Sequence, residues 1–196
     1  NTTDDGILSL IDQINEEVKQ ENSNKNPTIN STQRDYMAGE VSKDLTKRIL
    51  LPEDIVQAHE QGIIHFHDSD YFAQKEHNCD LINLEDMLQN GTNINGVMIE
   101  KPHRFLTAMT IATQIITAVS SSQYGGCTIT LTHLAPFVRA SKEVYERKYK
   151  ARGLNKDQIK QFVSEDLAKE ITDGVQTFQY QINSMTTTNG QAPFLS

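Results

Sequence analysis

The chain has 196 residues, of which 37% are hydrophobic and 22% charged, and its formal net charge is −8. This acidic balance argues against a broad nucleic-acid surface, which needs a basic stripe, although a small anionic ligand needs only local donors at a helix N-terminus. Because no apolar run reaches the roughly 20 residues that span a bilayer and the polar N-terminus has no signal-peptide pattern, we expect a helix-rich cytoplasmic protein with neither a membrane nor a nucleic-acid partner.

Helices are predicted for most of the N-terminal third. Aliphatic side chains at helical spacing mark a first helix over residues 4–21, and the polar run 21–27 follows it as a linker. Ser31 is a good N-cap for a second helix over residues 31–50. Pro52 suits the first turn of a short third helix, because the N–H that proline lacks has no helical partner there.

The segment that follows the third helix, residues 63–67, is predicted to be a strand. Because side chains alternate along a strand, Ile64 and Phe66 would be buried on one face. His65 and His67 would then point together to the other face. Buried sheets normally carry aliphatic residues on both faces, so an imidazole pair indicates a lined cavity.

A short helix is predicted over residues 83–89, where Asn90 and Gly91 provide a stop signal. Residues 93–100 are rich in turn-forming residues, and we expect them to form a turn-rich connector. The whole stretch therefore links the imidazole-bearing segment to the next long helix.

Pro102 opens a long helix that we expect to be buried on more than one side. Its main apolar face is formed by Phe105, Ala108, Met109, Ala112, Ile115, Ile116 and Val119. Gly125 and Gly126 are expected to end this helix in a left-handed cap. A strong strand pattern follows over residues 127–132.

Two more helices follow, over residues 134–151 and 155–186. Asn155 can cap the second of them, and Gln158 stands where a capping-box partner is expected. An apolar stripe continues along this second helix, which makes it unusually long. Residues 191–196 resemble the start of another strand.

Successive strand–helix units with long amphipathic helices predict an α/β layer or barrel with parallel strands. Only two or three strands are present, so a barrel would be incomplete in this chain. We therefore expect one partial domain over residues 1–196. It would consist of a helical segment, 1–61, followed by the first strands and long helices, 62–196.

Two chemical interpretations fit the residues around the imidazole pair. In the first, His65 and His67 bind zinc or iron together with Asp68 or His77. They could equally contact a substrate or satisfy buried polar groups. In the second interpretation, the Cys79 thiol reacts, with His77 as its base.

The two cysteines, Cys79 and Cys127, are expected to be reduced thiols in the cytosol. Cys127 fits a small buried apolar residue. The loop Ser120–Gly126 carries small hydroxyls and glycines that would let a ligand approach its backbone, but its spacing better fits a helix cap that carries polar side chains. It does not match a P-loop.

Four strings in this sequence resemble anaerobic (class III) ribonucleoside-triphosphate reductases, in the order found in that family. The strings are IHFHDSDY (64–71), HNCDLINL (77–84), SSQYGG (121–126) and NGQAPF (189–194). The resemblance runs from about Arg34 to the end of the chain. Four motifs in register are far more specific than any one of them.

The resemblance implies a helix-rich N-terminal part of a ten-stranded α/β barrel of the glycyl-radical type. Such enzymes reduce ribonucleoside triphosphates to deoxyribonucleotides, commonly with formate as reductant. A glycyl radical, installed by an iron–sulfur S-adenosylmethionine activase, generates a thiyl radical that abstracts the ribose 3′ hydrogen, and the 2′ hydroxyl leaves as water. The family also implies a structural zinc, a homodimer and allosteric ATP or dNTP effectors.

Carried over to this sequence, Cys79 matches a family cysteine that acts as the redox partner on the 2′ side of the substrate. The residues implied to position substrate or formate are His65, His67, Asn78, Ser121, Ser122 and Gln123. Cys127 receives no role, and no residue of this chain is implied as a metal ligand. The thiyl cysteine, the glycyl-radical loop, the zinc site and the N-terminal ATP-cone are implied to lie outside this sequence.

We therefore expect a piece of a reductase catalytic subunit that is inactive alone, with helices 102–124 and 155–186 contributing to the dimer and effector surface. Two other functions stay open on the residues alone. One is a mononuclear metalloenzyme that uses His65 and His67. The other is a non-catalytic module that binds nucleotides.

Overall fold

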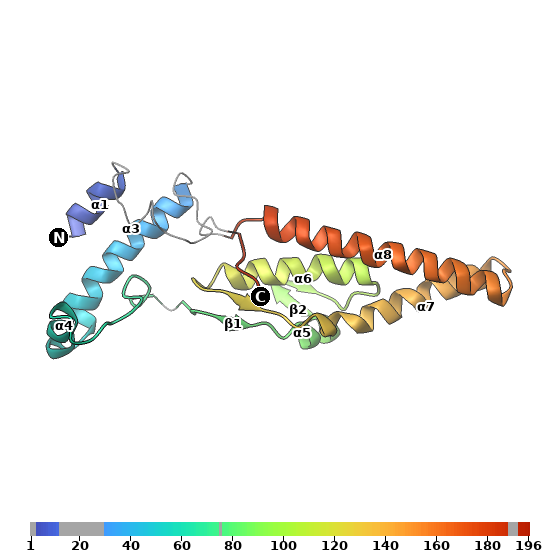
Figure 1. The fold of residues 1–196 in the computed structure, drawn as a ribbon, viewed down its shortest axis with the longest axis horizontal. Helices are drawn as coiled ribbons and strands as arrows, with labels where there is room; N and C mark the ends of the chain where they lie inside the picture. Colours follow the sequence, from blue (N-terminus) through green and yellow to red (C-terminus); the bar gives the residue numbers. More distant parts are fainter. Residues whose placement is uncertain (1–2, 12–29, 75, 188–191) are drawn as a thin grey trace. The chain divides into compact units, whose positions relative to one another are not determined.

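The computed structural model describes residues 3–11, 30–74, 76–187 and 192–196 (Figure 1). The chain forms two compact units, which we describe separately. The first unit consists of residues 1–78, 121–125 and 186–192. The second consists of residues 79–120, 126–185 and 193–196. Whether the chain forms the single partial domain expected above stays a prediction.

The first unit is built on helices α1 (Thr3–Ile11), α3 (Asn30–Leu45) and α4 (Glu53–Glu60). A π-helical turn, Thr46–Leu50, continues α3 to the predicted end of the second helix. The second and third helices are confirmed, although Pro52 is the N-cap of α4 and lies one residue before the predicted first turn. The predicted first helix is confirmed up to the end of α1, and its remainder and the linker lie outside the described residues.

The loop that carries the imidazole pair is tied to α3 by buried hydroxyl groups. The Ser42 hydroxyl donates to the carbonyl of Ser69 at 2.8 Å and accepts from the amide of Ala73 at 3.1 Å. Thr46 donates to the same Ser69 carbonyl at 3.2 Å. Because both hydroxyls are buried, these bonds fix the course of the loop without a β-ladder.

The strand predicted for residues 63–67 does not form. The amides of Ile63 and Ile64 both donate to the carbonyl of Ala58, at 2.9 and 3.3 Å, so they complete the C-terminal end of α4 instead of joining a sheet. The expected burial is also wrong for Ile64, which is exposed, whereas Phe66 is half-buried. The amides of Ile63 and Ile64 are bound to the last turn of α4, so they are not available to pair with another strand.

The second unit contains a pair of short parallel strands, β1 (Asp80–Leu81) and β4 (Cys127–Thr128). Asp80 lies opposite Cys127 in this register. The predicted strand 127–132 is therefore confirmed only at its start. Its end turns into a 3₁₀ helix, Leu131–Leu134, before the next long helix begins.

The C-terminal residues add a third extended segment beside β4. The amide of Cys127 donates to the carbonyl of Phe194 at 2.8 Å, and the amide of Ser196 donates back to Cys127 at 3.0 Å. The bridge between Cys127 and Leu195 is parallel. This pairing confirms the predicted strand start at the end of the chain, within the described residues 192–196.

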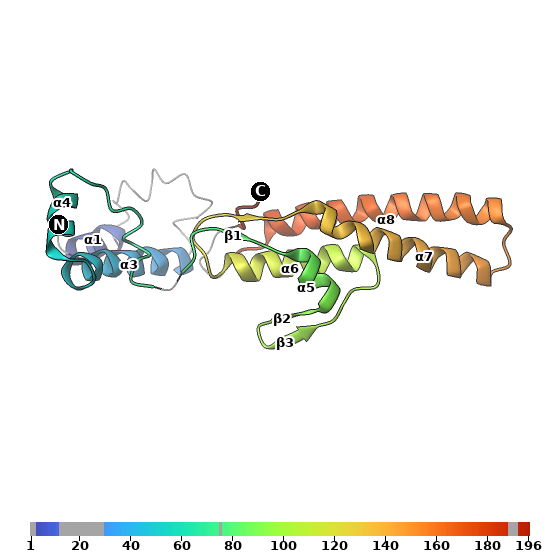
Figure 2. The same ribbon diagram turned by 90° about the horizontal axis from the view of Figure 1, so that it is seen from below.

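Helices α5 (Leu84–Asn90), α6 (Phe105–Ser120), α7 (Ala135–Ala151) and α8 (Lys156–Ser184) complete the second unit. The predicted capping box at Asn155 is present, with both of its hydrogen bonds to Gln158 formed. The N-terminal half of α8 runs beside α7 and its C-terminal half beside α6 (Figures 1 and 2). In the described part of the chain, no helix is both long and apolar enough to cross a membrane.

The stretch 93–100, predicted to be a turn-rich connector, lies in a hairpin whose two strands were not predicted. Strands β2 (Thr92–Ile94) and β3 (Val97–Ile99) pair in antiparallel fashion. Asn95 and Gly96 occupy its turn with φ angles of 52° and 83°. An Asn-Gly pair between short apolar runs is the usual signal for such a turn, and our sequence analysis missed it.

Helix α6 contributes much of the hydrophobic core, and its predicted apolar face is confirmed. Six of the seven residues of its predicted apolar face are buried, and Val119 is half-buried. The predicted left-handed cap at Gly125 and Gly126 is wrong: α6 ends at Ser120, and neither glycine has a positive φ. A Cβ at Gly126 would lie 2.7 Å from the ring of Phe194, so close packing explains this glycine.

A buried carboxylate on α8, Glu170, joins the three long helices of this unit. It accepts from the amide of Leu106 at 3.1 Å and from the hydroxyl of Ser141 on α7 at 3.0 Å. Its second oxygen accepts from Arg104 at 3.0 Å. Burial raises the pKa of Glu170, but the hydrogen bonds that converge on it outweigh burial and hold the pKa below its ordinary value of 4.5.

Replacing Glu170 by Gln should lower the free energy of unfolding by about 1–3 kcal/mol, because an amide N–H₂ would then face Arg104 and leave buried donors unmatched. Urea unfolding measures this loss. Glu165→Gln, on the exposed face of the same helix, is the control and should change stability by no more than about 0.5 kcal/mol. Equal losses in the two variants would contradict a special role for Glu170.

The contribution of Glu170 should also depend on pH. Because its pKa in the folded state lies below 4.5, the carboxylate stabilises the fold fully above pH 4.5, and this stabilisation is lost as the pH falls through the folded-state value. Urea unfolding of the wild type and of Glu170→Gln at several pH values should show a constant difference at neutral pH that narrows in acid. A difference that widens in acid would refute the assignment.

Candidate active site

The residues that the sequence analysis selected are divided between the two units. The first unit carries His65, His67, Asn78, Ser121, Ser122 and Gln123, and the second carries Cys79. Each group is therefore described within its own unit.

The two imidazoles share one side of the loop although the predicted strand is absent. Nε2 of His65 lies 3.2 Å from Nδ1 of His67, and the ring centroids are 5.4 Å apart. The side chain of His67 is 77% exposed, so the pair is open to a ligand. The predicted common orientation of the pair is confirmed, although the segment that carries it is not a strand.

Asp68 and Tyr124 extend the imidazole pair into a longer polar chain. Oδ1 of Asp68 lies 3.0 Å from Nε2 of His67, and Oδ2 accepts a hydrogen bond from the Tyr124 hydroxyl at 3.1 Å. The Tyr124 ring stacks on Tyr71, with centroids 4.0 Å apart and an interplanar angle of 5°. Asp68 was considered in the sequence only as part of a metal site, and no local pattern links it to Tyr124.

The loop residues 121–125 lie beside residues 76–78. The amide of Tyr124 donates to the carbonyl of His77 at 3.1 Å, and that of Gly125 donates to Asn78 at 2.7 Å. His77 and Gln123 form a parallel bridge. The structure therefore brings Asn78 next to the predicted hydroxyl-rich loop.

Gln123 is 1% exposed, and its Oε1 has no hydrogen-bond partner among the described residues. Its amide nitrogen donates to the carbonyl of Gly125 at 3.3 Å. An unmatched buried acceptor is costly in a folded protein and is commonly satisfied by a ligand or a water. This makes Gln123 a candidate for contact with a substrate donor group.

Cys79 is exposed just before β1, whereas Cys127 is buried on β4, and the two cysteines are not joined in a disulfide. Because side chains alternate along strands, Cys79 shares a face with Leu81, which is 85% exposed. Cys127 points to the other face, where its sulfur lies 3.4 Å from the hydroxyl of Ser120 on α6. Burial raises the pKa of the Cys127 thiol, which favours its neutral form.

A metal centre is not supported at the imidazole pair. Within the described ranges, no group of three or more His, Cys, Asp or Glu side chains is arranged to hold a metal ion. His65, His67 and Asp68 instead form a linear chain of hydrogen bonds. This chain engages both ring nitrogens of His67 and Nε2 of His65, which a metal at this pair would need as ligands.

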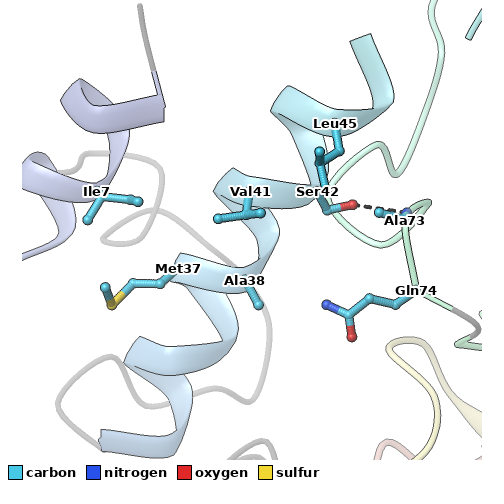
Figure 3. Close-up of a pocket in the computed structure, with 8 residues that line it drawn as sticks. All are labelled: Ile7, Met37, Ala38, Val41, Ser42, Leu45, Ala73 and Gln74. Carbon is cyan, nitrogen blue, oxygen red and sulfur yellow. Dashed lines mark hydrogen bonds between the residues drawn. The ribbon is translucent and has the colours of Figure 1, made fainter. Parts of the chain in front are cut away.

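A separate pocket of about 400 Å³ lies in the first unit (Figure 3). It is lined by Ile7, Met37, Ala38, Val41, Ser42, Leu45, Ala73 and Gln74. No charged side chain lines it, and its Ser42 hydroxyl already forms two hydrogen bonds. Triphosphates require cationic or N–H donors, so this pocket does not suit them, and it contains none of the predicted site residues.

Known proteins with similar sequences are anaerobic reductases. The enzyme named anaerobic ribonucleoside-triphosphate reductase from Haemophilus influenzae is 40% identical over 194 residues, which cover 97% of this chain and 27% of the relative. The Escherichia coli enzyme of the same name is 39% identical over 193 residues, with the same coverage. The enzyme from Enterobacteria phage T4 is 38% identical and is matched over 32% of its length. The chain thus spans about a quarter to a third of these relatives.

Solved structures share the fold at lower sequence identity. The anaerobic ribonucleotide reductase from Thermotoga maritima, solved in complex with dATP and CTP, superposes with a TM-score of 0.63 at 15% identity, over 97% of this chain and 30% of that one. The same enzyme with dATP in its specificity site gives a TM-score of 0.61. The family model described as anaerobic ribonucleoside-triphosphate reductase matches residues 21–196. This chain therefore belongs to the anaerobic ribonucleoside-triphosphate reductase family.

Proposed function

We propose that this chain is the part of a reductase catalytic subunit that supplies the reducing thiol, Cys79, and one side of the ribonucleotide pocket. The whole protein would convert ribonucleoside triphosphates to deoxyribonucleoside triphosphates. The observation that carries the proposal is the family match over residues 21–196, together with the exposure of Cys79 at the start of a parallel strand pair. The Thermotoga maritima structure with dATP and CTP supports nucleotides as the ligand class.

The position of Cys79 suits a site inside a barrel. In the ten-stranded α/β barrel that we propose for the whole protein, helices cover the outside, so the face of β1 and β4 opposite α6 becomes the inside. Cys79 and Leu81 lie on that uncovered face, whereas Cys127 packs towards α6. A thiol on the inner face can meet a sugar, and one on the outer face cannot.

The other predicted residues supply groups that can bind a sugar or a small anion. His65 and His67 present imidazole nitrogens, and Gln123 presents an unmatched acceptor. The carbonyls of Asn78 and Ser122 accept hydrogen bonds in the backbone pairing between residues 76–78 and the loop 121–125, and Ser121 precedes Ser122 in that loop. We propose that these groups position the substrate or formate while Cys79 serves as the redox partner at the 2′ carbon, where the hydroxyl leaves as water.

The remaining cofactors and partners are proposed from the family alone. They are a glycyl radical, formate, an iron–sulfur S-adenosylmethionine activase, allosteric ATP or dNTP and a homodimer in which α6 and α8 contribute to the interface. A structural zinc does not fit the two cysteines of this chain, because Cys79 and Cys127 point to opposite faces of one strand pair. We therefore assign no zinc ligand here.

Cys79→Ser in the full-length protein should reduce deoxynucleotide formation by about 100-fold or more, because serine cannot act as a redox partner. Anaerobic turnover after activation measures this loss. Binding of dNTP effectors should be unchanged, which separates the active site from effector binding. The 196-residue chain alone should show no turnover.

Cys127→Ala is the matched control, since it removes the other thiol from the opposite face of the strands. It should retain most of the activity in any preparation that stays folded. Normal turnover by Cys79→Ser would refute the proposed function. Nucleotide binding without turnover in the full-length activated wild type would favour a non-catalytic module instead.

A further inference from the structure

We propose that Asp68 and Tyr124 are positioning residues that hold His67 and His65 in one fixed tautomer, so that Nδ1 of His65 accepts a hydrogen bond from a ribose hydroxyl. The inference rests on the proposed function for its ligand, but the hydrogen-bond chain itself rests only on the geometry of the first unit. It concerns residues that the sequence motifs do not connect.

Which group donates and which accepts along the hydrogen-bond chain follows from the Asp68 carboxylate. An ionised carboxylate can only accept hydrogen bonds, and Oδ2 of Asp68 already accepts from the Tyr124 hydroxyl at 3.1 Å. Oδ1 lies 3.0 Å from Nε2 of His67, so that nitrogen must carry a proton. In the neutral ring, Nδ1 of His67 is then the acceptor.

The same logic fixes the second ring. Nδ1 of His67 lies 3.2 Å from Nε2 of His65, so Nε2 of His65 must donate. Its Nδ1 is therefore an acceptor, and it forms no hydrogen bond to any residue within the described ranges. Hydrogen bonds in a chain polarise one another, so the carboxylate strengthens the acceptor at the far end.

Several contacts hold the side chains of this hydrogen-bond chain in their positions. Asp68 adopts a φ of 55°, which is uncommon for a residue other than glycine, and its carboxylate lies beside the ring of its neighbour, His67. The stacking of Tyr124 on Tyr71 holds the ring whose hydroxyl binds Asp68. The amide of Phe66, between the two imidazoles, donates to Nδ1 of His59 at 3.2 Å.

Because its tautomer is fixed, the histidine pair can present a constant hydrogen-bond acceptor, which imidazoles that exchange between tautomers cannot. Nδ1 of His65 is then an acceptor before the ligand binds. Binding therefore does not include the free-energy cost of selecting one tautomer. A ribose hydroxyl is the donor that the proposed substrate offers. Asp68 and Tyr124 act through the imidazoles and do not touch the ligand themselves.

The first test is ¹⁵N NMR of the histidine rings in the 196-residue chain, which needs no turnover. In the wild type, His65 and His67 should each show a single tautomer with the proton on Nε2. Asp68→Ala should move the ring nitrogens of both histidines towards the averaged shifts of a free imidazole. A change confined to His67, or averaged shifts in the wild type, would overturn the proposal.

Tyr124→Phe tests the anchoring hydroxyl, because it keeps the stacked ring. It should produce a smaller shift of the same sign in both histidines. Tyr71→Phe is the matched control: it removes a hydroxyl from the other ring of the stack, and it should leave both tautomers as in the wild type. Equal shifts in these two variants would show a general loosening of the loop and would count against the proposal.

The second test uses the full-length activated protein. Asp68→Ala should raise KM for the ribonucleotide about tenfold, the equivalent of one lost hydrogen bond, with a smaller change in kcat. If Cys79→Ser is inactive and Asp68→Ala leaves KM unchanged, the positioning role fails while the proposed function stands. If Cys79→Ser is active, the proposed function fails. The NMR result alone then decides whether the hydrogen bonds from Asp68 and Tyr124 fix the tautomers of the two histidines.

Zinc titration of the same 196-residue chain distinguishes the remaining alternative. The proposal expects no stoichiometric binding of Zn²⁺. Binding of one equivalent that is lost in His65→Ala would overturn it, because the imidazole nitrogens would then be metal ligands instead of members of a hydrogen-bond chain.

Discussion

The second unit depends on a carboxylate from one helix that caps another. The first N–H groups of any helix lack partners within it, and in α6 those of Phe105 and Leu106 are bound by Ser141 and Glu170, which come from α7 and α8. A negative charge at this point also complements the positive end of the α6 dipole. The contact therefore sets where α6 begins and where two neighbouring helices cross it.

Removing water from Glu170 would be unfavourable for an isolated charge, and the surroundings offset this cost. Arg104 supplies a partner charge, and its guanidinium also lies 5.0 Å from the centroid of the Tyr145 ring. Burial, together with the neighbouring carboxylate, raises the pKa of Tyr145 to about 12, so its hydroxyl stays protonated. The close approach of the helices nearby requires Gly174, where a Cβ would lie 2.7 Å from the Phe105 ring.

The sequence predicted those parts of the fold that local contacts determine. Asn155 and Gln158 form their capping box within four residues, and the apolar spacing of α6 places its buried face correctly. Residues 63–67 could not be predicted in this way. Their alternation fits a strand, but the carbonyl of Ala58 and the ring of His59 bind three of their amides. The family resemblance selected the candidate residues, whereas the link from Asp68 to Tyr124 joins positions 56 residues apart.

The imidazole pair shows why a site can survive an incorrect secondary-structure assignment. Residues at i and i+2 share a side in any extended backbone, so His65 and His67 meet without a β-ladder. A ladder would have fixed them through backbone pairing. In its absence their orientation must come from side chains, and Asp68 and Tyr124 are in contact with the pair or with each other. A loop held by side-chain hydrogen bonds can place its imidazoles accurately only while those particular partners are present.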